Sequence, residues 1–147
     1  MITDALALLS DAQALTATAI STNVIDLGNP TPKNDIGIGE EMTIVFTVDV
    51  AADFTTGDET YQFDFNQSAA AALSSPTTLV RRIIAAGLLT LGSIHHLKIP
   101  KSAITQRYVG VNYTLGGTTP TLTITAFLQP SNMAEARATY AKGYTIS

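Results

Sequence analysis

Two adjacent histidines, His95 and His96, are the first residues of this sequence to consider for chemistry, because imidazole binds metals and transfers protons near neutral pH. They lie in a short apolar segment that we expect to form a strand. Successive side chains of a strand point to opposite faces, so the two rings cannot bind one metal ion. The sequence contains no cysteine and places no carboxylate at a ligand spacing from either histidine. We therefore expect a structural or surface role for this pair.

Acidic residues gathered around one turn carry the oxygen ligands that Ca²⁺ prefers. They are Asp49, Asp53, Asp58 and Glu59. The Asp-x-Asp-x-Asp-Gly order of a calcium-binding loop is missing, which favours solvated turn carboxylates instead. Glu40 and Glu41 do not suit a general acid and base, because neighbouring strand residues diverge. The run Gly-Gly-Thr-Thr at 116–119 lacks the following Lys-Ser/Thr of a phosphate-binding loop, and no Gly-x-Ser-x-Gly elbow is present. We predict no catalytic residue, cofactor or metal ion, and hence no enzyme.

Three arginines are candidates for contacts between subunits: Arg81, Arg82 and Arg107. Arginine binds carboxylates with two parallel hydrogen bonds, so an acidic patch on another subunit is one partner for them, and solvated strand ends are the alternative. The charges are unevenly distributed, since residues 1–64 hold eleven acids and one base while residues 65–147 hold one acid and seven bases. Such a division either attracts one subunit to another or is mixed within one fold. No dense basic cluster with interleaved aromatics is present, so we expect no nucleic-acid partner.

The composition favours a single β-rich domain with little charge. Of the 147 residues, 46% are apolar and only 14% are charged. Abundant β-branched residues indicate a sandwich whose surface is either covered by a partner or coated with threonine and exposed to water. No apolar run is long enough to span a membrane, and the N-terminus lacks the basic region of a secretory signal. We therefore expect no membrane partner.

The strongest pattern is the segment from Arg107 to Gln129, which predicts two strands joined by a tight loop at Gly116 and Gly117. Its second half alternates strictly between apolar and threonine-rich faces, which is typical of a half-buried strand. Glycine permits a positive φ, and Pro120 ends pairing before the return strand begins. We interpret the segment as a hairpin that forms the central ribbon of an all-β domain.

Further strands are predicted along the chain. Met42–Val50 and 60–66 alternate in the same way, and we expect them to pair around the turn at Gly57. Residues 77–86 fit a helical spacing as well as a strand, and the number of strands around them favours the strand. The total is about eight strands with turn signals between them, which predicts a jelly-roll-like antiparallel β-sandwich.

The two ends of the chain are less regular. Residues 1–14 are apolar and nearly uncharged, and Asp4 could cap a helix there. We predict an N-terminal arm over 1–14 that lies on a partner, with an edge strand of the same domain as the alternative. Residues 15–147 then form the single β-sandwich domain. One or two helical turns are expected over 133–140.

Several short motifs give the chain a family resemblance. They are Ser10-Asp-Ala-Gln-Ala14, Ser21-Thr-Asn23 and Ile25-Asp-Leu-Gly28 near the start, and Ile99-Pro100, Arg107-Tyr108, Asn112-Tyr113 and Thr125-Ala-Phe-Leu128 later. Together they span most of the chain, from Ser10 to Leu128. The pattern resembles the jelly-roll capsid cement (decoration) proteins of short-tailed bacteriophages, and its motifs are structural.

The resemblance implies a virion structural protein at the outer capsid surface. Such a protein binds the icosahedral phage head and clamps neighbouring subunits of the major capsid protein, which stabilises the shell. The resemblance also implies a homo-oligomer, for which we favour a dimer over a trimer. The alternatives are a lectin-like, carbohydrate-binding β-sandwich module and, third, an enzyme of unidentified type.

We predict that the contacts with these partners involve apolar residues near the N-terminus, three arginines and two tyrosines near the C-terminus. These candidate interface residues are Leu6, Leu8, Leu9, Leu15, Arg81, Arg82, Arg107, Tyr140 and Tyr144.

Overall fold

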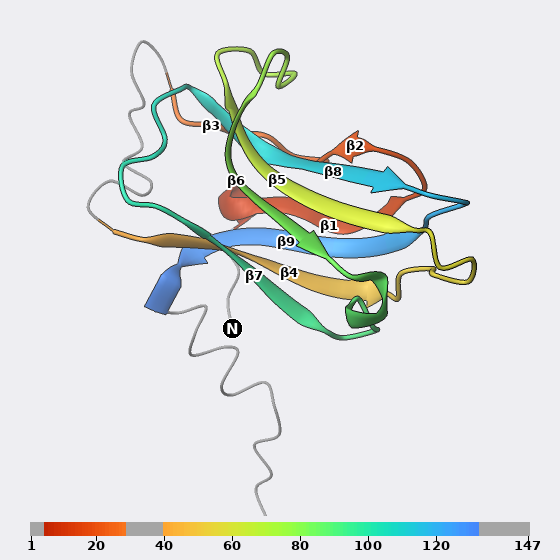
Figure 1. Ribbon diagram of the computed structural model, residues 1–147. Helices are drawn as coiled ribbons and strands as arrows, with labels where there is room; N and C mark the ends of the chain where they lie inside the picture. The colour runs from red at the N-terminus through yellow and green to blue at the C-terminus, as the bar shows by residue number, and fades with distance from the viewer. Residues whose placement is uncertain (1–4, 29–39, 133–147) are drawn as a thin grey trace, which may run out of the picture.

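In the computed structural model, two antiparallel β-sheets pack face to face (Figure 1). It describes residues 5–28 and 40–132. The strands are β1 (Leu8–Leu15), β2 (Ala19–Ile20), β3 (Ile25–Asp26), β4 (Met42–Val50), β5 (Thr60–Ser68), β6 (Thr77–Ile84), β7 (Ile94–Ile99), β8 (Tyr108–Gly116) and β9 (Leu122–Pro130). Two short 3₁₀ helices accompany them, η1 (Ala5–Ala7) and η2 (Ala86–Leu88). The all-β prediction is confirmed.

The strand order is that of a jelly roll. One sheet has the order β1-β9-β4-β7, and the other has the order β2-β8-β5-β6 with β3 also paired to β8. The antiparallel pairs β1–β9, β2–β8, β4–β7 and β5–β6 are nested, as in one long hairpin rolled over itself. A jelly roll has eight strands. Because β2 and β3 both pair with β8 and together take the place of one strand, the nine strands of the described residues correspond to these eight. About eight strands were predicted.

The predicted hairpins are wrong in their pairing, although their strands are right. β8 and β9 lie in different sheets, and the connection between them crosses from one layer to the other. β4 and β5 are separated in the same way, since β4 pairs with β7 and β9 while β5 pairs with β6 and β8. The physical reason is that alternation specifies which face of a strand is buried, whereas the partner strand is chosen by the whole sandwich.

The segment predicted as an N-terminal arm is an edge strand from Leu8 onward, and no helix forms over 8–15. β1 pairs with β9, and Leu9 and Leu15 are 0% and 2% exposed. The pairing is interrupted by a bulge at Ala12, whose φ is 43°. A bulge in an edge strand discourages pairing with another chain. The strand predicted over 77–86 is confirmed as β6, and the helical turns predicted over 133–140 lie outside the described residues.

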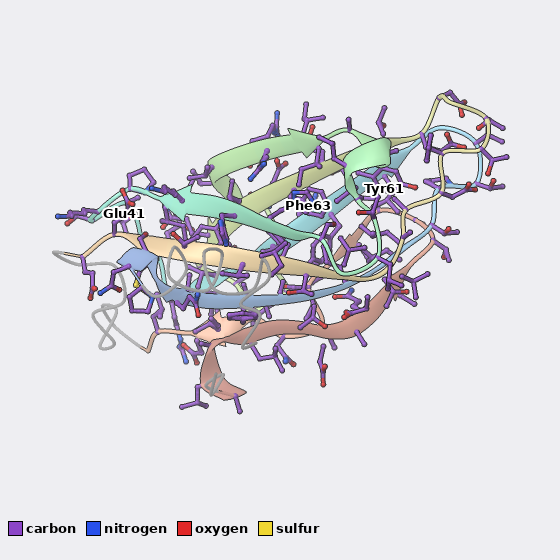
Figure 2. All side chains as sticks on the ribbon, turned by 90° about the horizontal axis from the view of Figure 1, so that it is seen from below. Glu41, Tyr61 and Phe63 are labelled. Carbon is purple, nitrogen blue, oxygen red and sulfur yellow. The ribbon has the colours of Figure 1, made fainter. Side chains whose placement is uncertain are left out.

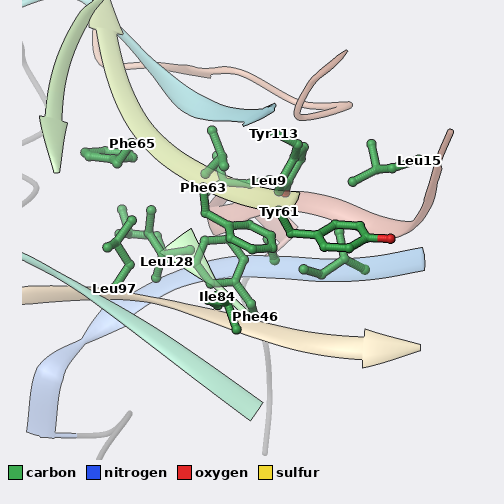
Figure 3. Packing of buried hydrophobic residues seen from close by; sticks show 14 of the residues in the cluster. Leu9, Leu15, Phe46, Tyr61, Phe63, Phe65, Ile84, Leu97, Tyr113 and Leu128 are labelled. Carbon is green, nitrogen blue, oxygen red and sulfur yellow. The ribbon is translucent and has the colours of Figure 1, made fainter. Parts of the chain in front are cut away.

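Aromatic rings join the two sheets at the centre of the core (Figure 3). Phe46 comes from β4 in one sheet, and Phe63 and Tyr113 come from β5 and β8 in the other. The ring centroids of Phe46 and Phe63 are 5.1 Å apart, and those of Phe63 and Tyr113 are 5.8 Å apart with nearly perpendicular planes. Tilted and edge-to-face contacts at these distances are favourable. The sheets are therefore fixed relative to each other by side-chain packing.

The two open sides of the sandwich are tied by polar side chains. On one side, Gln13 of β1 donates from Nε2 to the carbonyl of Ile20 at 2.9 Å and accepts from the backbone N–H of Thr22 at 3.0 Å. On the other side, the Arg82 guanidinium on β6 donates to the carbonyl of His96 on β7. Each bond joins opposite sheets or their connection, so the sandwich is held at its margins as well as through its core.

Candidate contact surface

The apolar residues predicted near the N-terminus divide between core and surface. Leu9 and Leu15 are buried in the protein's own core, so in this structure neither side chain is available to a partner, and both interface assignments need correction. Leu8 is half-buried and packs with Ile94 against Val45 and Phe127 on the outer face of the β1-β9-β4-β7 sheet. Leu6, in η1, is 83% exposed and remains a candidate for contact.

The three predicted arginines all have acceptors within the chain. Arg81 makes two hydrogen bonds to the carboxylate of Asp64, from Nε at 2.8 Å and from a terminal nitrogen at 3.0 Å. Arg107 binds Asp26 in the same way at 2.7 and 2.8 Å, and its guanidinium lies over the ring of Tyr108. The bidentate pairing expected with another subunit is thus made internally at these two positions. Tyr140 and Tyr144 lie outside the described residues.

The two histidines point to opposite faces of β7, as predicted. His95 is opposite Phe46 in the register and His96 is opposite Val45, and these partners belong to the core and to the outer face respectively. The His95 Nε2 atom lies 3.1 Å from the hydroxyl of Ser93 and 3.2 Å from the carbonyl of Leu88. Burial, helped by the Arg82 charge, lowers the pKa of His95.

The acidic turn holds its carboxylates by hydrogen bonds from its own loop. Glu59 accepts from the Thr56 hydroxyl and from the backbone N–H of Gly57 at 2.9 Å. Asp58 accepts from Thr118 across the loops, from its N–H at 3.1 Å and its hydroxyl at 3.0 Å. The hydroxyl bonds, above all those of Thr56, hold the pKa values of both carboxyls below their ordinary values.

The structure does not bring these four carboxylates together at one point. Asp49 accepts a hydrogen bond from Thr125 on the outer face of the sheet, at 2.6 Å, whereas Asp53 accepts from the N–H and hydroxyl of Thr55 in the loop. In the part of the chain that the structure describes, no cluster of three or more His, Cys, Asp or Glu side chains is arranged to hold a metal ion. Within the same ranges, no helix is long and apolar enough to cross a membrane.

A tyrosine ties the acidic turn to the loop between β8 and β9. The hydroxyl of Tyr61 donates toward the carbonyl of Asp53 at 2.6 Å and that of Thr121 at 3.1 Å. The N–H of Asp53 also donates to the Thr121 carbonyl at 3.0 Å. Burial raises the pKa of Tyr61, so its hydroxyl keeps the proton that it donates. Figure 2 shows Tyr61 near this end of the sandwich and Glu41 near the opposite end.

Large apolar side chains are exposed at the same end of the sandwich, on the last residue of β4 and on the connections β4–β5 and β6–β7. They are Val50, Phe54, Leu88 and Leu91. Backbone hydrogen bonds hold these connections together, from Ala52 N to Leu89 O at 2.9 Å and from Gly92 N to Val48 O at 2.8 Å. We call these four residues, together with Asp53, Asp58 and Glu59, the acidic apolar end; it lies on the right in Figure 1.

The sequence drew attention to the carboxylates of the acidic apolar end but not to its exposed apolar side chains. Leu88 and Leu91 belong to a short apolar segment, which sequence alone cannot distinguish from core. Their exposed fractions of 63% and 72% are known only from the fold. The signal available in the sequence was that residues 85–93 are uncharged and largely apolar and contain Gly92, a residue type that is common in turns.

An open hollow lies on the outer face of the β1-β9-β4-β7 sheet. It has a volume of about 400 Å³, and its lining includes Leu8, Asp11, Asp49 and Phe127. Thr125 crosses its floor, where its hydroxyl accepts from the N–H of Ala12 at 2.9 Å and donates to Asp49. These bonds join β1, β9 and the end of β4, so the polar groups of the hollow stabilise the bulge at Ala12.

Comparisons with known proteins place the chain in a family. The family model described as Bbp16 matches residues 9–128, from β1 into β9. A solved structure titled "Crystal structure of PirA" is similar, with a TM-score of 0.43 and 9% sequence identity, covering 82% of this chain and 95% of that chain. The comparison with curated proteins found no match.

Proposed function

We propose that this chain, which belongs to the Bbp16 family, is a capsid cement (decoration) protein of a bacteriophage. It binds the outer surface of the icosahedral head and clamps neighbouring subunits of the major capsid protein, which stabilises the shell. It acts through contacts and catalyses no reaction. Its partners are the major capsid protein and a second copy of itself, with a trimer as the alternative to the dimer.

The observation that carries this proposal is a sandwich, tied at its core and both margins, that exposes large apolar side chains at separated places. Among the described residues these side chains are Leu6, Ile20, Val50, Phe54, Ile83, Leu88 and Leu91. Exposed apolar surface marks contact sites between proteins where several such side chains gather, as four of these do at the acidic apolar end. Because they project from η1, β2, β6, the end of β4 and the connections beside it, the molecule offers contacts to more than one neighbour at a time.

A repeating shell converts modest contacts into firm retention. When one contact of a multivalent protein is made, the next is made within the same complex at a high effective concentration. A symmetric oligomer on a symmetry axis of the shell uses the same surface twice, which doubles the number of contacts. The sequence resemblance to capsid cement proteins, from Ser10 to Leu128, covers the same strands that form the tied sandwich.

Co-sedimentation with purified phage shells that lack this protein tests the proposal. We expect the wild-type protein to pellet with expanded shells, to saturate at a fixed number of copies per capsid subunit, and to raise the temperature at which the shells break. A protein that stays in the supernatant and leaves the breaking temperature unchanged would refute the proposal. Excess unlabelled protein should displace a labelled sample, which controls for non-specific pelleting.

One observation favours the carbohydrate-binding alternative. Phe54 is exposed beside Asp53 and Thr55, and lectin sites commonly stack a sugar on an aromatic ring next to polar groups. A glycan array distinguishes the two functions. Binding to one glycan class that is abolished by Phe54→Ala, together with no binding to shells, would favour the alternative.

A further inference from the structure

The acidic apolar end combines exposed apolar side chains with negative charge. Its four large apolar side chains are more than half exposed. Around them lie the carboxylates of Asp53 and Asp58, with that of Glu59 buried at 8% exposed, and the segments 48–60, 85–93 and 116–122 contain no lysine, arginine or histidine. Three cations of the described residues pair with carboxylates elsewhere, Arg81 with Asp64, Arg107 with Asp26 and Lys98 with Glu41, and Arg82 donates to the carbonyl of His96.

This surface is held in place before any partner arrives. The loop between β8 and β9 lies directly on the acidic turn, because a Cβ at Gly117 would be only 2.5 Å from the carbonyl oxygen of Asp58. The hydrogen bonds of Tyr61 and Thr118 fasten the same two loops to each other. A prearranged surface loses little conformational entropy on binding, so its apolar area contributes to affinity.

We propose that the acidic apolar end docks onto a protein surface that carries an apolar hollow with a rim of lysine and arginine. The apolar side chains fill the hollow, and the carboxylates face the basic rim. If the proposed function holds, on which this assignment of the partner rests, that surface belongs to the major capsid protein.

Charge selects this occupant over the other kinds. Two copies of the chain meeting through this end would bring the six carboxylates of Asp53, Asp58 and Glu59 together, which opposes association. Nucleic acids and anionic membranes are repelled for the same reason. The homo-oligomer of the proposed function must therefore use a different face, and this end is left for a basic partner.

The first test uses phage shells and the double variant Leu88→Ser/Leu91→Ser. We expect its affinity for shells to fall by about a factor of ten or more, because each leucine loses the benefit of burial. The matched control is Ala71→Ser/Ala72→Ser, which changes two exposed residues of the β5–β6 connection, and it should retain wild-type binding. Both variants change only exposed side chains, so their urea midpoints should stay near that of the wild type.

The outcomes separate the inference from the proposed function. If the wild type does not bind shells, the proposed function fails. If the wild type and the leucine double variant bind equally, or if only the Ala71→Ser/Ala72→Ser control loses binding, the function stands and the inference is overturned. Raising the salt concentration should weaken wild-type binding, since charge attraction is screened; binding that strengthens with salt would contradict the basic rim.

The second test needs no shell. A peptide of alternating leucine and lysine is titrated into the isotopically labelled full-length protein and followed by NMR. We expect shifts confined to residues 50–59 and 88–92, absent in the double variant, and no shifts with a leucine and glutamate peptide. Shifts elsewhere, or none, would overturn the inference whether or not shells bind.

Discussion

Replacing Gly117 with alanine should loosen the acidic apolar end by separating two loops. Gly117 has a φ of +94°, and its missing Cβ lets the β8–β9 loop lie against the backbone of Asp58 and Glu59. A new Cβ would be 2.5 Å from the Asp58 carbonyl oxygen and 2.7 Å from Glu59 Cα. These atoms are backbone, so they cannot swing aside as a flexible side chain would. The loops must part.

The magnitude has two components, which a second glycine separates. A non-glycine residue in the left-handed region costs about 1–2 kcal/mol. Gly92 has a φ of +77° with nothing within 4 Å of its Cβ position, so Gly92→Ala pays this cost alone. Gly117→Ala has the same conformational cost and, in addition, about 1–3 kcal/mol from overpacking. The difference between the two variants therefore measures the close approach of the loops.

Urea denaturation followed by circular dichroism gives the two free energies of unfolding. We expect Gly117→Ala to be less stable than Gly92→Ala by about 1–3 kcal/mol at an unchanged denaturant slope. In a thermal melt the same gap is roughly 2–12 °C for a domain of this size. Equal midpoints for the two variants would refute the reasoning, because the loops would then accept a Cβ between them at no cost.

Three further predictions concern the core, the N-terminus and pH. Phe63→Ala removes a buried ring from the aromatic centre and should cost about 3–5 kcal/mol in urea titrations; a loss below about 1 kcal/mol would contradict tight packing. Deleting residues 1–7 should leave a cooperative transition in circular dichroism, whereas deleting residues 1–15 removes β1 and should abolish it; equal behaviour would show that β1 is dispensable. Hydrogen bonds from Arg107 hold the pKa of Asp26 at about 2, below its ordinary value of 3.8. Because the folded state binds this proton more weakly, the stabilisation is complete above about pH 5 and is lost as pH falls toward 2. Thermal melts of Asp26→Asn should therefore depend less on pH over that range than those of the wild type, and parallel curves would contradict the assignment.

The strands themselves could be predicted because each one carries its burial pattern locally. The strand predicted from the sequence over Met42–Val50 has the same bounds as β4 in the structure. β6 and β7 were also located, although β6 fits a helical spacing. The pairing could not be predicted, since residues such as Ile124 on β9 and Val111 on β8 show only that they are buried, and both choices of neighbour bury them equally.

The surface was harder to predict than the core. Arg81 and Arg107 were candidates for contact with another subunit or for solvated strand ends, but strand pairing places Asp64 and Asp26 beside them. Leu9 and Leu15 were expected on a partner, but the sandwich uses them in its own core. Leu88 and Leu91 attracted no prediction, because an apolar side chain is normally buried, and only the folded chain shows that these two are not.

The sequence by itself determined that this protein is a β-sandwich of about eight strands, because alternation with a period of two is a property of each strand alone. It also set the separation of charge along the chain. Tertiary structure decided which strands are neighbours, which arginines are satisfied internally, and where carboxylates and exposed leucines come together. Those outcomes depend on contacts between residues far apart in the chain, and such contacts have no local signature in the sequence.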